Sequence, residues 1–548
     1  MNVRQPCRRE SLLLLLLFAL PFFVSLGGSL RGANEAFYTQ TPREMLQRGD
    51  WLVPYFNGET RLNKPPLSYW LVAASYKLFS VSVFGERVPM ALLAFSCIVA
   101  VFVIGKSFQM DERTALLSAA ILATTFRFLI LARRLLIDVL LLACILWALV
   151  CFLLWLRSRK KSQFLLACLF FSLAFLTKGP VGLLPLLVLA LFLWFSGRWE
   201  ELRRTPWLAG SLLGLGLCSW WYVGLGWRMG WEPIRRMFLH ENVARFLSTD
   251  FGPSRGPFFY VGVFLADFFP WSLLFPAAVV WSLAAWKNHP SRKWADPVLL
   301  SALWCGFFFL FFSASRNKID YYLLPVYPFA ALWIGLYLGQ ARPPGVLITA
   351  ISALVLVFSL LVAAAAWVLL PGISWWIPLL VLPILLVGLH SRRFVLFAAG
   401  LALFYVASFA LYLEPFEAYQ PVRPFARTIE NQPAWAEPER TVRGTQAGYY
   451  KLASPSLTFY LNAPILELSD LATAARHLTS SSPVYLIVHS RDFPELERAA
   501  GRLQILEIRP MLQFRGESLL RALRGHSFEN LREAWIVPVY LVTNDGGA

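Results

Sequence analysis

Runs of apolar residues alternate with short polar segments along most of the chain. Many of these runs contain about twenty residues, the length that a helix needs to cross the hydrocarbon core of a bilayer. The pattern therefore predicts a polytopic α-helical membrane protein with about thirteen transmembrane helices. We expect the first helix in the run that begins near residue 10, and the others near 88–108, 115–132, 135–156, 164–177, 180–196, 207–227, 257–286, 297–315, 321–340, 346–370, 374–390 and 394–413.

The N-terminal segment "RRESLLLLLLFALPFFVSL" has a basic start and a long apolar core. A secretory signal peptide has the same two features. Because many further spans follow this segment, we interpret it as a first helix that the protein retains.

The polar segments between the apolar runs form two alternating sets. One set is short and rich in Lys and Arg, with "GKSFQMDER", "RSRKKSQ", "GRWEELRR" and "HSRR" as examples. The positive-inside rule places this set in the cytoplasm. The other set contains 31–87, 228–256 and the chain after 413, which we expect on the outer face. The sequence thus predicts a multi-pass protein of the plasma (inner) membrane, with a cytoplasmic N-terminus and an extracytoplasmic, periplasmic C-terminal domain.

Composition supports a membrane protein and argues against nucleic-acid binding. Of the 548 residues, 57% are hydrophobic and 15% are charged, which is too few charged residues for a soluble protein of this length. The net charge of +18 lies mostly in the short clusters between apolar runs. The seven cysteines show no metal-ligand spacing, and all but Cys7 lie in apolar runs, so we interpret them as small core residues.

The chain changes character after the last apolar run. Strand-like stretches appear as "LTFYLN", "VYLIVHS", "LQILEI" and "WIVPVYLV", separated by helix-like stretches such as "DLATAARHL" and "PELERAAGRL". Strands that alternate with helices indicate a small α/β domain. We therefore divide the chain into a membrane domain, 1–413, and a C-terminal α/β domain, 414–548.

The expected outer segments carry polar residues that can face a substrate at the membrane surface. Asn34 and Glu35 follow the first span. Lys64 precedes the rigid pair Pro65–Pro66, which fixes the local backbone. Asp138 lies in the apolar run "RRLLIDVLLL", where an ionisable group is costly and marks a candidate functional site. Further candidates on the same face are Lys178, His240, Arg245, Arg316, Lys318 and Tyr322.

Each candidate also has a less specific interpretation. Arg and Lys at a membrane boundary more often anchor a protein in headgroups than bind a substrate. His240 fits a surface histidine, and Asp138 fits a structural partner of Arg133 or Arg134. Taken together, the cations, tyrosines and carboxylates of one face suit an anionic substrate such as a lipid phosphate, because cations stabilise the phosphate and a negative leaving group.

Four segments carry a resemblance to a known family. They are "NEAFYTQTPREMLQRGDWLVPYFNGETRLNKPPLSYWLVAASYKLF", "TKGPVGLLP", "HENVARF" followed by "DFGPSRGPFFY", and "SRNKIDYYLLPVYP". In order and spacing the chain resembles the bacterial C-type (GT-C) glycosyltransferases, in the superfamily of the lipid A aminoarabinose transferases and the protein O-mannosyltransferases. The resemblance runs from about residue 10 to 413, and in weaker form through the C-terminal part.

The resemblance implies roles for the acidic residues. The family has an Asp-Glu pair in the first outer loop, and its first acid is the usual candidate base; Asn34 stands at that position and Glu35 at the second. An amide orients a substrate but does not accept a proton near neutral pH. We therefore expect Glu35 to face the mouth of the cavity as the base, with Asp138, which matches an acid at the cavity edge, as the alternative. In the competing interpretation Glu35 caps the helix or pairs with Arg31 or Arg43.

The resemblance also implies a site for the lipid phosphate. Lys64 matches a lysine that contacts the phosphate, and Arg245 and Tyr322 match an arginine and a tyrosine beside it. His240 matches a histidine of the same loop. Asn63 replaces a glutamate of the family, which removes an oxygen ligand of the kind that hard metals prefer. We expect no divalent metal to be required and no other cofactor.

The predicted function is the transfer of a sugar, aminoarabinose-like or another pentose or hexose, from a polyprenyl-phosphate donor to an outer-face acceptor. The acceptor is lipid A, another glycolipid, a glycan or a protein. One alternative is a protein O-mannosyltransferase, and another is a membrane protein that binds polyprenyl lipids without turnover. A transporter is disfavoured, because the polar clusters lie at one face and transporter sites usually lie near the middle of the membrane.

Overall fold

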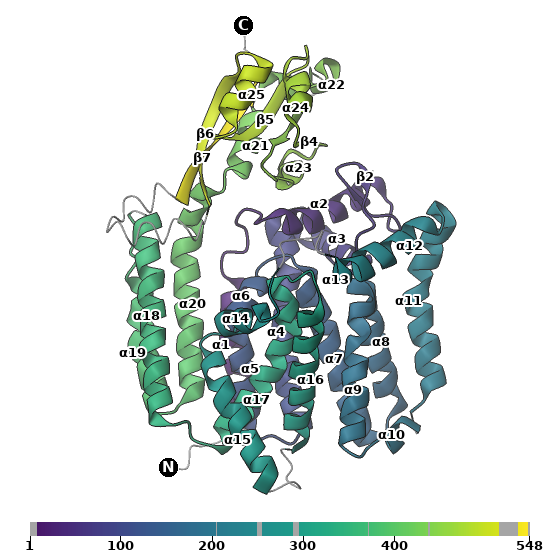
Figure 1. Cartoon of the computed structure of the whole chain (residues 1–548), viewed down its shortest axis with the longest axis vertical. Coiled ribbons are helices and arrows are strands. Elements are labelled where there is room, and N and C mark those ends of the chain that lie inside the picture. The colour runs from purple at the N-terminus through teal and green to yellow at the C-terminus, as the bar shows by residue number, and fades with distance from the viewer. Residues whose placement is uncertain are drawn as a thin grey trace.

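The structure, a computed structural model, describes residues 8–203, 205–248, 255–288, 295–370, 372–436, 439–513 and 535–545. Residues 249–254 of the predicted outer loop 228–256, and Cys7, lie outside these ranges. Long helices stand side by side and form the body of the molecule, and a small α/β domain lies at one end of them (Figure 1). The predicted fold class is confirmed.

Eight helices of the described residues are long and apolar enough to cross a membrane, or up to ten if each of two bent helix pairs is one span. The total of about thirteen therefore stays a prediction. The helices of the body are α1 (Arg8–Phe23), α4 (Val83–Ser107), α5 (Glu112–Ala123), α6 (Phe126–Ala132), α7 (Ile137–Ser158), α8 (Lys161–Lys178), α9 (Leu184–Phe195), α11 (Trp207–Met229), α14 (Phe259–Asp267), α15 (Phe275–Asn288), α16 (Ala295–Ala314), α17 (Tyr327–Gln340), α18 (Gly345–Leu369), α19 (Leu382–His390) and α20 (Phe394–Phe416).

Helix α7 lies at the centre of the body and α11 at its rim. Of the most apolar part of α7, 83% is buried inside the protein, whereas the corresponding figure for α11 is 22%. An apolar helix that is exposed on most of its surface is stable only against lipid, because water would leave its side chains without apolar contacts. Two predicted spans are bent: α5 and α6 meet at 68°, and α14 meets the helix that follows it at 113°. The Trp271 indole donates to Thr124 Oγ1 at 3.0 Å and links the two bends.

The chain turns back on itself between α8 and α9. The short 3₁₀ segment η1 (Gly179–Leu183) reverses the direction of the chain at this point. Gly182 lies so close to Ala174 that a Cβ on it would be 2.5 Å from the Ala174 carbonyl carbon and oxygen. Only glycine allows this approach. The reversal leaves Lys178 at the exposed end of α8, on the same face as the start of α7.

Several shorter elements cover that face of the body. They are α2 (Ala33–Arg48), the hairpin of β1 (Tyr55–Phe56) and β2 (Glu59–Thr60), α3 (Leu67–Phe79), α12 (Glu232–Phe238), the π-helical segment η2 (Leu239–Ala244), α13 (Arg245–Leu247) and η4 (Asp320–Val326). In Figure 1, α2 and α12 lie across the ends of the long helices. Segments far apart in the sequence therefore meet at one membrane face.

The C-terminal domain contains a five-stranded sheet in the order β4-β3-β5-β7-β6. Strands β3 (Gln446–Tyr450), β4 (Leu466–Leu468) and β5 (Val484–His489) are parallel, and β7 (Ile536–Thr543) is antiparallel to both β5 and β6 (Gln504–Leu512). The predicted strands at β5, β6 and β7 are confirmed, as are the helices α24 (Leu471–Leu478) and α25 (Phe493–Ala500). Strands β3 and β4 were not predicted.

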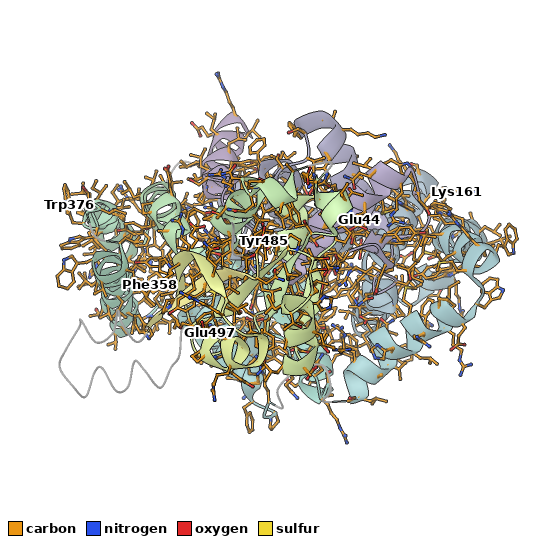
Figure 2. All side chains as sticks on the ribbon, turned by 90° about the horizontal axis from the view of Figure 1, so that it is seen from above. Glu44, Lys161, Phe358, Trp376, Tyr485 and Glu497 are labelled. Atoms are coloured by element: carbon orange, nitrogen blue, oxygen red, sulfur yellow. The ribbon has the colours of Figure 1, made fainter. Side chains whose placement is uncertain are left out.

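The predicted strand "LTFYLN" is wrong, because the segment forms helix α23 (Ser456–Leu461). Pro455 stands at its N-cap and Asn462 ends it in the left-handed conformation. The helix docks on α2: the Phe459 carbonyl accepts from Arg43 Nη1 at 2.7 Å. Burial against a second element thus outweighs the strand preference of its aromatic residues. From above (Figure 2), the domain, marked by Tyr485, lies near the centre of the molecule, while Trp376 marks the rim.

Candidate active site

Three charged side chains from two distant segments meet at the covered face. Lys64 precedes α3, and Glu241 and Arg245 lie one helical turn apart on η2 and α13. Lys64 Nζ is 2.6 Å from Glu241 Oε2, and Arg245 Nη2 is 3.1 Å from the same oxygen. The Lys64 side chain is 14% exposed and that of Glu241 is 9% exposed. Two cations therefore converge on a place that one anionic oxygen fills.

Burial and charge act in opposite directions on these three groups. Burial lowers the pKa of Lys64 to about 8, although Glu241 favours the charged form. Burial alone would raise the pKa of Glu241, but Lys64 and Arg245 hold it below its usual value. Burial also opposes the charge of Arg245, yet Glu241 and the Tyr322 hydroxyl raise its pKa. At neutral pH all three are charged, and Lys64 lies nearest to its titration point.

A second pair of charged groups lies next to this cluster. Lys178 Nζ donates to Asp138 Oδ1 at 2.5 Å and lies 4.6 Å from the centre of the Tyr322 ring. Asp138 is in the first turn of α7 and Lys178 in the last turn of α8, so the antiparallel helices bring them together. Arg133, which we considered as a partner of Asp138, instead donates to the Pro21 carbonyl at 3.3 Å.

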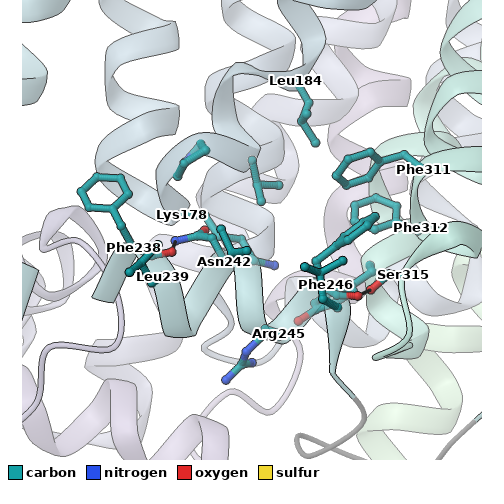
Figure 3. A pocket seen from close by; sticks show the side chains of 15 residues that line it. Lys178, Leu184, Phe238, Leu239, Asn242, Arg245, Phe246, Phe311, Phe312 and Ser315 are labelled. Carbon is teal, nitrogen blue, oxygen red and sulfur yellow. Dashed lines mark hydrogen bonds between the residues drawn. The ribbon is translucent and has the colours of Figure 1, made fainter. Parts of the chain in front are cut away.

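An apolar cavity of about 470 Å³ opens beside these groups. Its walls come from η1, α9, α12, η2, α13 and α16, and its polar side chains include Lys178, Arg245 and Tyr322. In Figure 3, Phe246 faces Phe311 and Phe312, and the side chain of Arg245 extends away from the apolar walls. A cavity with this lining suits a molecule that has a long apolar part and one anionic group.

Two further candidates lie on the other side of η2. His240, Asn63 and Glu241 line a second cavity of about 480 Å³, which is more polar than the first. His240 Nδ1 is 3.7 Å from Glu241 Oε1. The Asn63 carbonyl accepts from Lys64 Nζ at 3.0 Å. Both residues therefore lie next to the cation cluster but outside the apolar cavity.

Three predicted site residues lie farther from the cluster or at its edge. Asn34 Nδ2 donates to the Tyr321 hydroxyl at 3.4 Å, at the start of η4. Lys318 is buried and donates to the Ser315 carbonyl at 2.5 Å. Arg316 is exposed, and its backbone N–H donates to the Phe246 carbonyl. No contact of the Lys318 or Arg316 side chain with Lys64 or Arg245 is found among the described residues.

Glu35 does not face the cavity, and our expectation about its orientation is wrong. The side chain is 0% exposed. It accepts from Arg87 Nε at 2.9 Å, from the Arg31 backbone at 2.6 Å and from the Leu135 backbone at 3.2 Å. Burial opposes its charge, but Arg87 and Arg134 hold the pKa of Glu35 below its usual value. This arrangement makes Glu35 a buried counter-ion that joins α2 to α4.

Sequence reasoning missed two features of the site. Glu241 was noticed in the motif "HENVARF" but received no role, since nothing in the sequence shows that both cations contact it. Arg87 was not considered, although it is an arginine near the start of an apolar run, which is an unusual place for a charge. That signal was enough to find it.

The described residues contain no group of three or more His, Cys, Asp or Glu side chains placed to hold a metal ion. Around Asn63 and His240 the carboxylate of Glu241 is already bound to Lys64 and Arg245. The donor set at this point therefore fits a metal poorly.

Comparison with known sequences gives matches over most of the chain. The family model for dolichyl-phosphate-mannose-protein mannosyltransferase matches residues 63–222. An uncharacterized protein of Aquifex aeolicus (strain VF5) is 31% identical over 468 residues, which cover 84% of this chain and 88% of that protein. An undecaprenyl phosphate-alpha-4-amino-4-deoxy-L-arabinose arabinosyl transferase of Pseudomonas aeruginosa (strain LESB58) is 31% identical over 353 residues. That match covers 62% of this chain and 61% of the transferase.

Solved structures share the fold of most or nearly all of the chain. The crystal structure of ArnT from Cupriavidus metallidurans bound to undecaprenyl phosphate aligns over 99% of both chains, with a TM-score of 0.76 and 19% identity. The archaeal oligosaccharyltransferase AglB from Archaeoglobus fulgidus aligns over 88% of this chain and 70% of its own, with a TM-score of 0.52 and 12% identity. The first alignment includes the C-terminal α/β domain.

Proposed function

The chain belongs to the GT-C glycosyltransferases, in the superfamily of the aminoarabinose transferases and protein mannosyltransferases, and we propose that it transfers a sugar from a polyprenyl-phosphate donor to an acceptor at the membrane surface. One observation carries this proposal above the others: an apolar cavity ends at Lys178, Arg245 and Tyr322, and Lys64 converges with Arg245 on the place of one anionic oxygen. The name of the Pseudomonas relative supports an aminoarabinose-like sugar on undecaprenyl phosphate. We propose lipid A as the acceptor.

In this proposal the polyprenyl chain enters the cavity from the bilayer. Phe246, Phe311 and Phe312 line its walls, and burial of the first isoprene units against them stabilises binding by about 25 cal/mol per Å² of apolar surface. Arg245 and Lys64 bind the phosphate oxygens, because charge-assisted bonds of Arg and Lys to phosphate are the strong ones. The cations also stabilise the charge that develops on the leaving phosphate.

We assign the proton transfer to Asp138. Its carboxylate is held beside Lys178, a cation that lines the apolar cavity, while Glu35 is buried elsewhere. As the acceptor hydroxyl oxygen attacks the anomeric carbon, its proton passes to Asp138. The bond between that carbon and the phosphate oxygen breaks, and its electron pair stays on the phosphate. Asn34, beside Tyr321, orients the acceptor but takes no proton.

Replacing Arg245 by alanine tests the donor site. Loss of a charge-assisted contact should weaken the binding of polyprenyl phosphate by about 1.5–3 kcal/mol, which is roughly a ten- to hundred-fold rise in Kd. Arg316→Ala is the matched control, because Arg316 is exposed and its side chain does not line the cavity. Isothermal titration of each purified variant in nanodiscs measures its Kd for polyprenyl phosphate. Equal affinity in the wild type and Arg245→Ala would remove Arg245 from the site.

Donor affinity should also fall as the pH rises through about 8. Burial lowers the pKa of Lys64 to about 8, so below that pH the ammonium group is charged and above it the group is neutral. Since the phosphate binds the charged form, affinity is full below pH 8 and declines above it. A Lys64→Arg variant stays charged across this range. Its affinity should therefore change much less between pH 7 and 9.5, and parallel curves for the two proteins would contradict the assignment.

The charges of the loops support a proposal for the membrane and the membrane face on which the site lies. We propose that the face with Lys64 and Arg245 is extracytoplasmic and that the membrane is the inner membrane, because the opposite loops are rich in Lys and Arg. A reporter fused after residue 548 should be active in the periplasm.

We also propose that transfer needs no divalent metal, supported by the donor set around Asn63. Transfer that a chelator abolishes and added metal restores would overturn that second proposal.

A protein acceptor is the second candidate. The family model for dolichyl-phosphate-mannose-protein mannosyltransferase matches residues 63–222, which include Lys64, Asp138 and Lys178. In either reaction Lys64 would bind the donor phosphate and Asp138 would take the proton. The presence of these residues therefore does not show whether the acceptor is a lipid or a protein. Mass spectrometry of lipid A and of envelope proteins, with and without the gene, distinguishes the two acceptors. A sugar that disappears from lipid A without the gene supports the lipid acceptor, and a sugar that disappears from a protein supports the protein acceptor.

A further inference from the structure

Glu241 lies between the two cations to which we assign the phosphate. A single oxygen of its carboxylate, Oε2, contacts both Lys64 and Arg245, at 2.6 and 3.1 Å. The other oxygen lies 3.7 Å from His240. A site that only needed to attract an anion would not contain a buried anion of its own, because that anion offsets one of the two positive charges.

The segment that carries Glu241 has an unusual backbone. Residues Leu239–Ala244 form a π-helical turn between α12 and α13. Such turns are rare and occur mostly at functional sites. Asn242, on the same turn, donates to the Phe238 carbonyl at 3.3 Å and lines the apolar cavity, while Glu241 lines the polar one. The turn therefore separates the two cavities and presents Glu241 next to the phosphate position.

The charges of the site leave one net positive charge. The cations are Lys64, Arg245 and Lys178, and the anions are Glu241 and Asp138. A glycosyl phosphodiester carries one negative charge and would make the site neutral. After transfer the phosphate is a monoester, which carries about −1.5 to −2 charges near pH 7. Directly after transfer the acceptor proton on Asp138 balances this added charge. Once Asp138 has released the proton, the charge of the product exceeds the net charge of the site, beside Glu241.

We propose that Glu241 makes the site selective for the monoanionic diester donor over the dianionic monoester product. The inference rests on the proposed function, since it concerns the same phosphate site. When the bond from the anomeric carbon to oxygen breaks, the electron pair remains on the phosphate and its charge grows. Repulsion from the Glu241 carboxylate then weakens the hold of Lys64 and Arg245 on the product. Glu241 is a positioning and specificity residue and not a catalytic one.

Two probes separate this role from a structural one. Undecaprenyl phosphate represents the product, and its methyl ester, a stable diester, represents the donor. Their Kd values are measured at about pH 7.5, where the monoester is mostly dianionic, with the full chain in phosphatidylcholine nanodiscs. Glu241→Gln should bind the monoester roughly ten-fold or more tightly than the wild type does, and the diester should change by less than about three-fold.

Two control variants accompany this comparison. Glu241→Asp keeps the charge and should keep the wild-type ratio of the two Kd values. Glu200→Gln removes an exposed carboxylate that pairs with Arg203 and lines neither cavity of the site, and it should leave both values unchanged. In a transfer assay, added undecaprenyl phosphate should inhibit Glu241→Gln more strongly than the wild type.

The outcomes point to different conclusions. If Glu241→Gln binds both esters more weakly, or both more tightly by the same factor, the selectivity role is wrong. If the wild type binds both esters and Glu241→Gln has unchanged Kd values, only the role of Glu241 falls. If the wild type binds neither ester, the proposed function itself falls.

Discussion

Asp138→Asn should lower the rate of sugar transfer by about 10²–10⁴-fold, the usual loss when a general base is removed. The variant keeps the shape of the side chain but loses the ability to accept a proton. Donor binding should remain, because Lys178 still lies over the Tyr322 ring and the contacts of Lys64 and Arg245 are unchanged. A loss of turnover with an unchanged Kd is the signature of a residue that acts on the reaction.

The matched control for this experiment is Asp296→Asn. Asp296 forms an ion pair with Arg198 at 2.5 Å and lines neither cavity of the site. It lies in the first turn of α16, whereas Phe311 and Phe312 of the cavity wall lie near the other end of that helix. The Asp296→Asn variant should transfer sugar at the wild-type rate. Wild-type turnover by Asp138→Asn would show that another group takes the proton, and our assignment of the base would be withdrawn.

Glu35→Gln should destabilise the protein more than it affects donor binding. The Arg87 side chain is only 4% exposed, so loss of the Glu35 charge leaves a buried cation without its nearest counter-ion. Breaking a buried pair in this way costs about 3–5 kcal/mol. Because Glu35 also accepts from the Arg31 and Leu135 backbones, the start of α2 should loosen as well. Thermal unfolding in detergent measures the effect as a fall in Tm.

Glu112→Gln is the control for Glu35→Gln. Glu112 pairs with Lys106 at 3.1 Å, and the two side chains are 21% and 40% exposed. An ion pair of this kind contributes at most about 1 kcal/mol, so its loss should shift Tm little. A stable Glu35→Gln that binds donor and fails to transfer would contradict the scaffold role and restore Glu35 as the base.

The membrane architecture was predictable because it depends on local composition. An apolar run of sufficient length becomes a span whatever its neighbours are. The bend at Thr124 was not predictable, since it involves a hydrogen bond from Trp271 that lies 147 positions away. The helix at 456–461 was mistaken for a strand for a similar reason, because its contacts with α2 decide its conformation.

The site was predictable in part. Asp138 was found because a charge within an apolar run is costly and therefore informative. Lys64 and Arg245 were found because their segments resemble the motifs of the family, and Lys178 because it lies in another of those segments. The direction in which a carboxylate points could not be predicted in this way, because it depends on which partner contacts it in the folded protein. Glu35 is paired with Arg87, 52 positions later, and nothing in the first outer segment shows this contact.

The central claim is that this chain moves a sugar from a polyprenyl phosphate. The most direct measurement incubates the purified protein in nanodiscs with undecaprenyl phosphate that carries a radiolabelled sugar, with lipid A as acceptor and Asp138→Asn as the blank. We predict that label appears on the lipid A while an equal amount of undecaprenyl phosphate is released, and that the blank shows neither. If the wild type binds the donor but no label leaves it with lipid A, glycan or peptide acceptors, the protein is a lipid-binding member of the family without turnover, and the claim is contradicted.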